Sequence, residues 1–104
     1  MKPAIERLEA LLAQQGESAV LRFSLGNACL DTAPAQAAEH LRRAVALDPQ
    51  YSAAWKLLGR ALVACDDTAQ AKQAYQSGVA VAEARGDIQA AKEMRVFLKR
   101  LDKN

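Results

Sequence analysis

Apolar residues recur along this chain at the three- and four-residue spacing that places them on one face of an α-helix. Short segments rich in glycine, proline, aspartate and serine separate six such stretches, and these residue types end helices and form turns. We therefore predict six helices, over about residues 3–15, 18–30, 34–47, 52–65, 68–85 and 87–102. Because the loops between them are short, sequential helices should pack antiparallel.

Local chemistry supports the predicted boundaries. Gly86 is suited to the left-handed conformation that ends a helix, and Asp87 behind it is a favourable N-cap for the sixth helix. Ser52 is a good N-cap for the fourth helix. Asp31 and Thr32 can cap the third helix in the same way.

A characteristic set of residues occurs twice, about one repeat length of 34 residues apart. The second copy consists of Trp55, Leu58, Gly59 and Leu62, followed by Ala71 and Tyr75. The first copy consists of Arg22, Leu25, Gly26 and Cys29, followed by Ala37, Leu41, Ala44 and Pro49. Such a period predicts stacked helical hairpins, which bury their apolar faces only against their neighbours.

These two sets of residues resemble the signature of the tetratricopeptide repeat, over most of the chain. The resemblance implies that Gly26 and Gly59 lie where two antiparallel helices cross closely, and that Leu41 and Tyr75 fill the space between successive repeats. The second copy departs from the first because Gly78 replaces the second alanine and no proline ends the unit. We therefore expect the fifth helix to be unusually long.

The predicted fold is all-α: a right-handed stack of antiparallel helical hairpins forming one domain over residues 1–104. Within it, residues 1–16 form a half-repeat helix, residues 18–49 and 52–85 form two repeats, and residues 87–102 form a capping helix. As a whole the chain resembles small bacterial stand-alone tetratricopeptide proteins, which have no assigned biochemical activity. The resemblance implies a protein-binding role, without naming the partner.

The composition agrees with a small helical domain. Hydrophobic residues make up 51% of the chain and aromatic residues only 5%, so most of the apolar content is small. The chain contains 23 alanines, and alanine has the highest helix propensity of all residues. A chain of 104 residues supports one compact core and not two.

Charge and hydropathy argue against several classes of protein. The net charge is +2 with both signs interspersed, well short of the strongly basic surface of a nucleic-acid binder. The N-terminal segment lacks the apolar core of a signal peptide, and no stretch has the length of a membrane span. We therefore expect a cytoplasmic protein that does not bind membranes.

The sequence offers no set of catalytic or metal-binding residues, so we predict neither an enzyme nor a cofactor. His40 is the only histidine, and we interpret it as a lone surface residue. Cys29 and Cys65 belong to no metal-binding motif, and we interpret both as small buried hydrophobic residues.

In tetratricopeptide repeats the first helix of each hairpin builds the concave face. Transferred to this chain, and extended to the last predicted helix, the resemblance implies a groove of mixed apolar and basic character. Its candidate residues are Phe23, Asn27, Lys56, Leu57, Arg60, Lys92 and Arg95. Such a groove suits a peptide or protein segment that is acidic or carries a free carboxylate. The alternative is that these cations only form a solvated face.

Two other functions stay open. Ile5, Leu8 and Leu12 on the first predicted helix lack a partner hairpin and could pair with another copy of the chain, which would make a homo-oligomeric structural protein. Nucleic-acid binding is the weaker alternative, because aromatic residues for base stacking are scarce. It would use Lys92, Arg95, Lys99, Arg100 and Lys103.

Overall fold

The computed structural model of the protein describes residues 3–103. Within that range the chain forms α1 (Pro3–Gln15), α2 (Ala19–Cys29), α3 (Pro34–Leu47), α4 (Ser52–Ala64), α5 (Thr68–Ala84) and α6 (Ile88–Asp102), and contains no β-strand. The predicted all-α fold with six helices is therefore confirmed. α5 is the longest of the six helices, with 17 residues, as the missing proline predicted.

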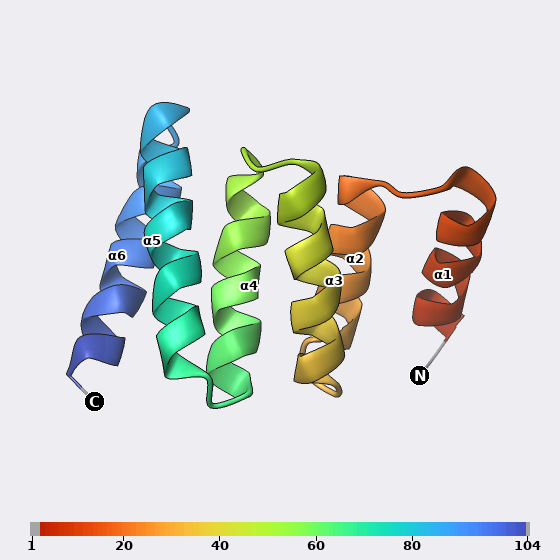
Figure 1. Cartoon of the computed structure of the whole chain (residues 1–104), viewed down its shortest axis with the longest axis horizontal. Coiled ribbons are helices and arrows are strands. Elements are labelled where there is room, and N and C mark those ends of the chain that lie inside the picture. The colour runs from red at the N-terminus through yellow and green to blue at the C-terminus, as the bar shows by residue number, and fades with distance from the viewer. Residues whose placement is uncertain (1–2, 104) are drawn as a thin grey trace.

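Figure 1 shows the helices stacked in chain order from α1 to α6, each running opposite to the one before it, with α2 partly behind α3 and α6 partly behind α5. The stack measures 40 × 28 × 18 Å. α2 and α3 form one hairpin, and α4 and α5 form the next. α6 packs on α5 and also contacts α4, in the same way that α4 packs on α3 and contacts α2. α6 therefore occupies the position of the first helix of a third hairpin.

Each hairpin is closed at a glycine that lies against a large side chain of its second helix. A Cβ atom on Gly26 would come within 2.5 Å of Cγ of Leu41, and one on Gly59 would overlap the ring of Tyr75. The close helix crossings predicted at both glycines are confirmed. Leu41 and Tyr75 are both almost completely buried in these contacts, and the ring of Tyr75 also lies 5.4 Å from that of Phe97 on α6.

Three of the helix starts are capped by side chains. Ser18 accepts a hydrogen bond from the backbone N–H of Leu21, and Asp67 accepts one from Gln70. Asp87 caps α6 through the N–H of Ala90, as predicted. These bonds satisfy backbone donors that have no partner inside the helix.

The predicted cap at Ser52 is wrong. Tyr51 is the N-cap of α4, without a side-chain bond, and Ser52 begins the helix. The Ser52 hydroxyl instead donates to Oδ2 of Asp87 over 3.2 Å, and so connects the start of α4 to the turn between α5 and α6. The sequence could not show this bond because its two partners are 35 positions apart.

The predicted cap of α3 is also wrong. Ala33 is the N-cap, and it supplies no side-chain oxygen, so neither Asp31 nor Thr32 caps this helix. Pro34 compensates in part, because it occupies the first turn, and a proline there has no N–H that needs a partner.

Two predictions about single side chains need correction. Cys29 is buried, but Cys65 is exposed where α4 ends. His40 is half-buried, and its Nδ1 lies 3.0 Å from Nη1 of Arg22 on α2. Burial, with the Arg22 charge beside it, lowers the pKa of His40, so its neutral form is favoured.

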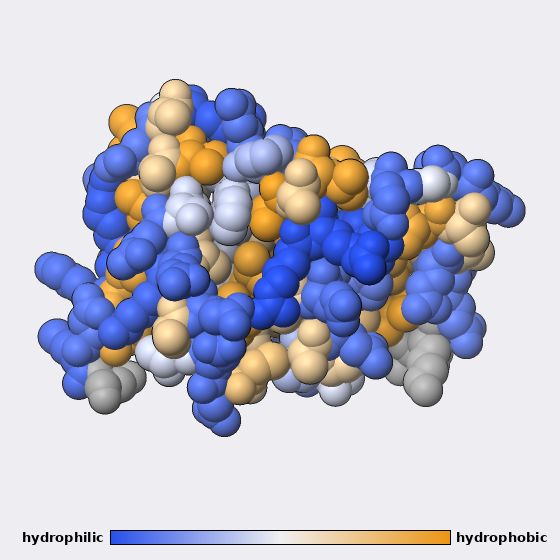
Figure 2. Space-filling model, in the orientation of Figure 1, coloured by the Kyte–Doolittle hydropathy of each residue, from blue (hydrophilic) through white to orange (hydrophobic). Residues whose placement is uncertain are grey.

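α1 differs from the other helices because it packs against α2 alone. Ile5, Leu8 and Leu12 are each only half-buried. On the face of the molecule in Figure 2, hydrophobic residues appear in separate groups between hydrophilic side chains.

Candidate binding groove

α4, the first helix of its hairpin, contacts α2 on one side and α6 on the other, and residues of all three helices line one pocket. It has a volume of about 380 Å³. Its lining residues are Phe23, Asn27, Ala53, Lys56, Leu57, Asp87, Gln89, Ala90 and Glu93. We call it the Lys56 pocket. It contains four of the seven residues that the sequence predicted for the groove, namely Phe23, Asn27, Lys56 and Leu57.

The Lys56 pocket contains two apolar side chains that pack against their neighbours. Leu57 is buried in the main core, and Phe23 is half-buried with its ring centroid 5.0 Å from that of Tyr51. Side chains that already pack within the protein lose less rotamer freedom when a partner docks, which lowers the entropic cost of binding.

The charge of Lys56 is already neutralised within the protein. Its ammonium donates to the carboxylate of Glu93 on α6, and Nε2 of Gln89 donates to the second carboxylate oxygen over 3.3 Å. The hydrogen bond from Lys56, followed by that from Gln89, lowers the pKa of Glu93, which favours the ionised form. With Asp87 also in its lining, the Lys56 pocket holds two carboxylates and one ammonium, so it is polar and slightly acidic and not the basic site predicted from the sequence.

A second pocket lies between α4, α5 and α6 and has a volume of about 340 Å³. It is lined by Arg60, Val63, Tyr75, Phe97, Arg100 and Leu101. We call it the Arg60 pocket. Arg60 is the fifth of the seven predicted residues, and it follows Lys56 by one turn of α4.

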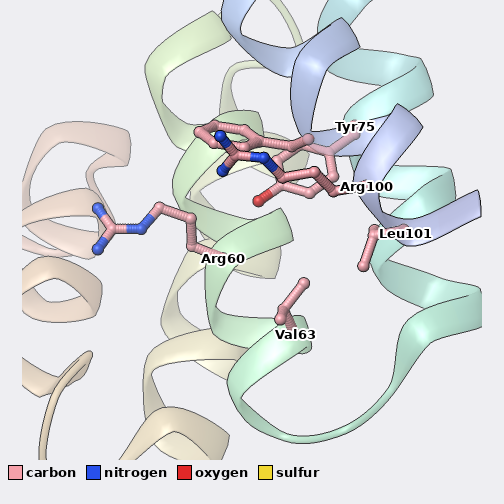
Figure 3. Close-up of a pocket in the computed structure, with 6 residues that line it drawn as sticks. Arg60, Val63, Tyr75, Arg100 and Leu101 are labelled. Carbon is pink, nitrogen blue, oxygen red and sulfur yellow. The ribbon is translucent and has the colours of Figure 1, made fainter. Parts of the chain in front are cut away.

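The Arg60 pocket has an apolar interior, and two arginines are among its lining residues. Figure 3 shows the Arg100 guanidinium beside Tyr75, whereas the Arg60 side chain extends from α4 with its guanidinium pointing away from Val63 and Leu101. Val63 and Leu101 face the cavity from α4 and α6, and the Tyr75 hydroxyl points into it. The Arg100 guanidinium lies 5.8 Å from the centroid of the Phe97 ring, within range of a cation–π contact. Among residues 3–103, neither Arg60 nor Arg100 forms an ion pair.

Tyr75 is protonated throughout the physiological pH range. Burial raises the pKa of Tyr75 to about 12, and the nearby charge of Arg60 offsets this only in part. Its hydroxyl is therefore a neutral donor at the base of the Arg60 pocket.

The predicted orientation of α6 is wrong for two of its cations. Arg95 pairs with Glu83 on α5, away from the groove, and Lys92 is exposed and lines neither pocket. Helix α6 instead directs Ala90 and Glu93 into the Lys56 pocket.

Gly78 allows α6 to pack closely on α5. Gly78 is buried on α5, and a Cβ there would overlap Sδ of Met94 and lie 2.9 Å from Cβ of Trp55. The absence of a side chain at this position admits the Met94 side chain, which is fully buried. With Met94 against α5, Glu93 lies on the side of α6 that faces Lys56 of α4.

Sequence reasoning thus missed several groove residues: Tyr75, Gln89, Glu93, Phe97, Arg100 and Leu101. A usable signal existed for Phe97 and Leu101, since both belong to the apolar stripe of α6. Both residues are half-buried, so part of each side chain stays available to the pocket. For Glu93 the sequence contained no signal, because its partner Lys56 lies 37 positions away.

Two further classes of site were sought in the part of the chain that the structure describes. Over residues 3–103, no cluster of three or more histidine, cysteine or acidic side chains is placed to hold a metal ion. None of the helices in the same range combines the length and apolarity needed to cross a membrane.

A row of helical hairpins whose first helices line a groove defines a helical-repeat scaffold. Residues 31–94 match the family model described as Tetratricopeptide repeat. The chain belongs to the tetratricopeptide repeat family, as the sequence resemblance predicted.

Two similar proteins match this chain over nearly their whole length, and a longer one matches it over part of its length. The chain is 54% identical to TPR repeat-containing protein PA0015 of Pseudomonas aeruginosa, over 95% of each chain. It is 47% identical to protein BPP2914 from Bordetella parapertussis, whose solution structure superposes with a TM-score of 0.84 over 99% of this chain and 90% of the other. The chain is also 25% identical to MamA protein, whose crystal structure superposes with a TM-score of 0.73 over 95% of this chain and 57% of the MamA chain.

Proposed function

We propose that the protein is a non-enzymatic adaptor that binds a segment of a partner protein in the groove formed by α2, α4 and α6. Repeats of this family are generally protein-interaction modules. The observation that carries the proposal is the line of two pockets along α4, with Lys56 and Leu57 in one and Arg60 and Val63 in the other. A segment lying along α4 would engage both.

The groove offers what a docked segment needs. Its apolar surfaces are held by packing, as at Phe23 and Leu57, and its polar groups stand beside them. Such a combination of fixed apolar anchors and a polar rim is typical of protein interfaces. We propose a cytoplasmic location for this activity, in keeping with the sequence prediction.

We propose an acidic segment, but assign its recognition to Arg60 and not to Lys56. Glu93 neutralises Lys56, so a carboxylate of the bound segment would have to displace the carboxylate of Glu93. Arg60 has no such competitor among residues 3–103.

A steric block of the groove tests the proposal. Ala53 is exposed, lines the Lys56 pocket and tolerates a long side chain without loss of core packing. Peptides selected from a random displayed library on the immobilised protein should bind Ala53→Arg at least tenfold more weakly than wild type in fluorescence anisotropy. The matched control is Ala80→Arg, at an exposed position of α5 that lines neither pocket.

Wild-type affinity in Ala80→Arg together with weakened binding in Ala53→Arg would support the groove. Equal affinity in both variants would refute it. Circular dichroism of each variant verifies that helicity is unchanged.

The second candidate function is self-association, which the packing of α1 favours. α1 covers only α2, and Ile5, Leu8 and Leu12 are half-buried. Molar mass measured by light scattering at two protein concentrations tests this. A mass that rises toward twice 11.2 kDa would support self-association, and a constant mass of 11.2 kDa would exclude it.

A further inference from the structure

The two pockets of the groove differ in the charge that they offer to a ligand. In the Lys56 pocket the only ammonium is paired with Glu93 across the groove. In the Arg60 pocket two guanidiniums have no carboxylate partner among residues 3–103, and no acidic residue lines the cavity. The attraction for anions is therefore concentrated at one end of the groove.

We propose that the Arg60 pocket is a specificity subsite that takes a large apolar side chain flanked by carboxylates. The inference rests on the proposed function, because it names the chemistry of the segment that the groove binds. The side chain enters between Val63 and Leu101, and the carboxylates on either side of it meet Arg60 and Arg100.

The interior of the pocket selects an apolar group. Apart from the arginines, its walls are two aliphatic side chains and two aromatic rings, those of Tyr75 and Phe97. Val63 is 39% exposed, so its side chain offers apolar surface to a ligand. A ligand side chain that covers Val63 removes apolar surface from water on both partners, which favours binding.

The rim selects for negative charge. An arginine guanidinium can bind a carboxylate through two parallel hydrogen bonds, and Arg60 and Arg100 reach the pocket from different helices. Both side chains are exposed, so the attraction should weaken with added salt. The Tyr75 hydroxyl, kept protonated by burial, can donate a further hydrogen bond at the base of the pocket.

The Lys56 pocket sets the direction of the bound segment. Glu93 and Asp87 line it, so carboxylates of the ligand are disfavoured there and neutral polar groups are preferred. The acidic, apolar-containing part of the segment should therefore lie toward the C-terminal end of α4, and its neutral part toward the N-terminal end.

The selection experiment described above tests this inference when the selected peptides are sequenced. We expect enrichment of Phe, Leu, Ile, Met or Trp with Asp or Glu within two positions. For a selected peptide, replacing its acidic residues by Gln should weaken binding to wild type about tenfold at low salt. The same replacement should change binding to the double variant Arg60→Gln/Arg100→Gln by less than about twofold.

The matched control is Lys99→Gln, which removes a cation of α6 that lines neither pocket. It should keep wild-type affinity and wild-type preference for acidic peptides. All three substituted residues are exposed, so the fold should not change.

The failure of this inference is distinguishable from the failure of the proposed function. If selected peptides are sensitive to Ala53→Arg but show no acidic preference, or bind Arg60→Gln/Arg100→Gln as tightly as wild type, the subsite assignment is wrong and the groove still stands. If no peptide is sensitive to Ala53→Arg, both are wrong.

Discussion

Lys56 of α4 and Glu93 of α6 form an ion pair across the mouth of the groove, with the ammonium donating to the carboxylate. This pair joins the first helices of successive hairpins and neutralises the only ammonium in the lining of the Lys56 pocket. It also determines which end of the groove attracts anions, since Arg60, one turn along α4, has no carboxylate partner in the described part of the chain.

Removing the carboxylate of this pair should change binding more than stability. With Glu93→Gln, Lys56 becomes available to a ligand, so acidic peptides should bind more tightly, by roughly three- to tenfold. The effect on unfolding should be small, because the pair is solvent-accessible. Glu83→Gln is the control, since it removes the carboxylate that pairs with Arg95 outside the groove. If both variants bind acidic peptides alike, Lys56 is not masked by Glu93.

The crossing of α4 and α5 depends on the missing side chain of Gly59. A methyl group there would overlap the Tyr75 ring, which is 2% exposed and has little room to move. Overpacking costs about 1–3 kcal/mol, and the better helix propensity of alanine returns about 1 kcal/mol. Gly59→Ala should therefore lower the free energy of unfolding by about 1–2 kcal/mol, measured by urea denaturation. Stability equal to wild type would mean that the crossing is looser than the structure shows.

Asp66 holds a backbone conformation that favours glycine. Its φ is 59°, and it follows the C-cap of α4, where Asp67 N–H bonds to Leu62 O over 2.9 Å. Gly86, with φ of 76°, has the same place after α5. Asp66→Gly should thus stabilise the protein by about 0.5–1 kcal/mol, and Gly86→Asp should destabilise it by a similar amount. Thermal unfolding measures the change in stability of each variant. A loss of stability in Asp66→Gly would show that the positive φ of Asp66 is not strained.

The two thiols should differ in reactivity. Cys65 is exposed, whereas Cys29 is 2% exposed and burial raises the pKa of its thiol. A thiol reagent such as DTNB should therefore label one cysteine in the native protein and the second only after denaturation. Cys65→Ser should abolish the native labelling. Native labelling that persists in Cys65→Ser would show that α2 opens readily.

The helices were predictable because their signals are local. Apolar spacing, and caps such as Ser18 and Asp87, depend on residues within one or two turns of each other. The close approach at Gly59 also followed from the repeat pattern, because only a residue without Cβ fits against Tyr75 there.

The composition of the groove was harder to predict because it depends on the rotation of α6. That rotation places Met94 against Gly78 and Glu93 beside Lys56, contacts between helices that the sequence pattern of α6 alone does not reveal. In the predicted orientation of α6, Lys92 and Arg95 face the groove, whereas in the structure Glu93 does. The expected positive charge of the Lys56 pocket is therefore reversed. Similarly, the sequence predicted Ser52 as a cap, but its hydroxyl donates a hydrogen bond to Asp87 in the turn between α5 and α6.

An NMR titration of the 11.2 kDa protein with a library-selected peptide tests the central claim, binding in the groove, most directly. Amide signals should shift around Asn27, Ala53, Arg60 and Val63, in α2, α4 and the facing side of α6, and hardly at all around Ala80 of α5. Shifts confined to α1, or to the faces of α3 and α5 away from the groove, would contradict the claim.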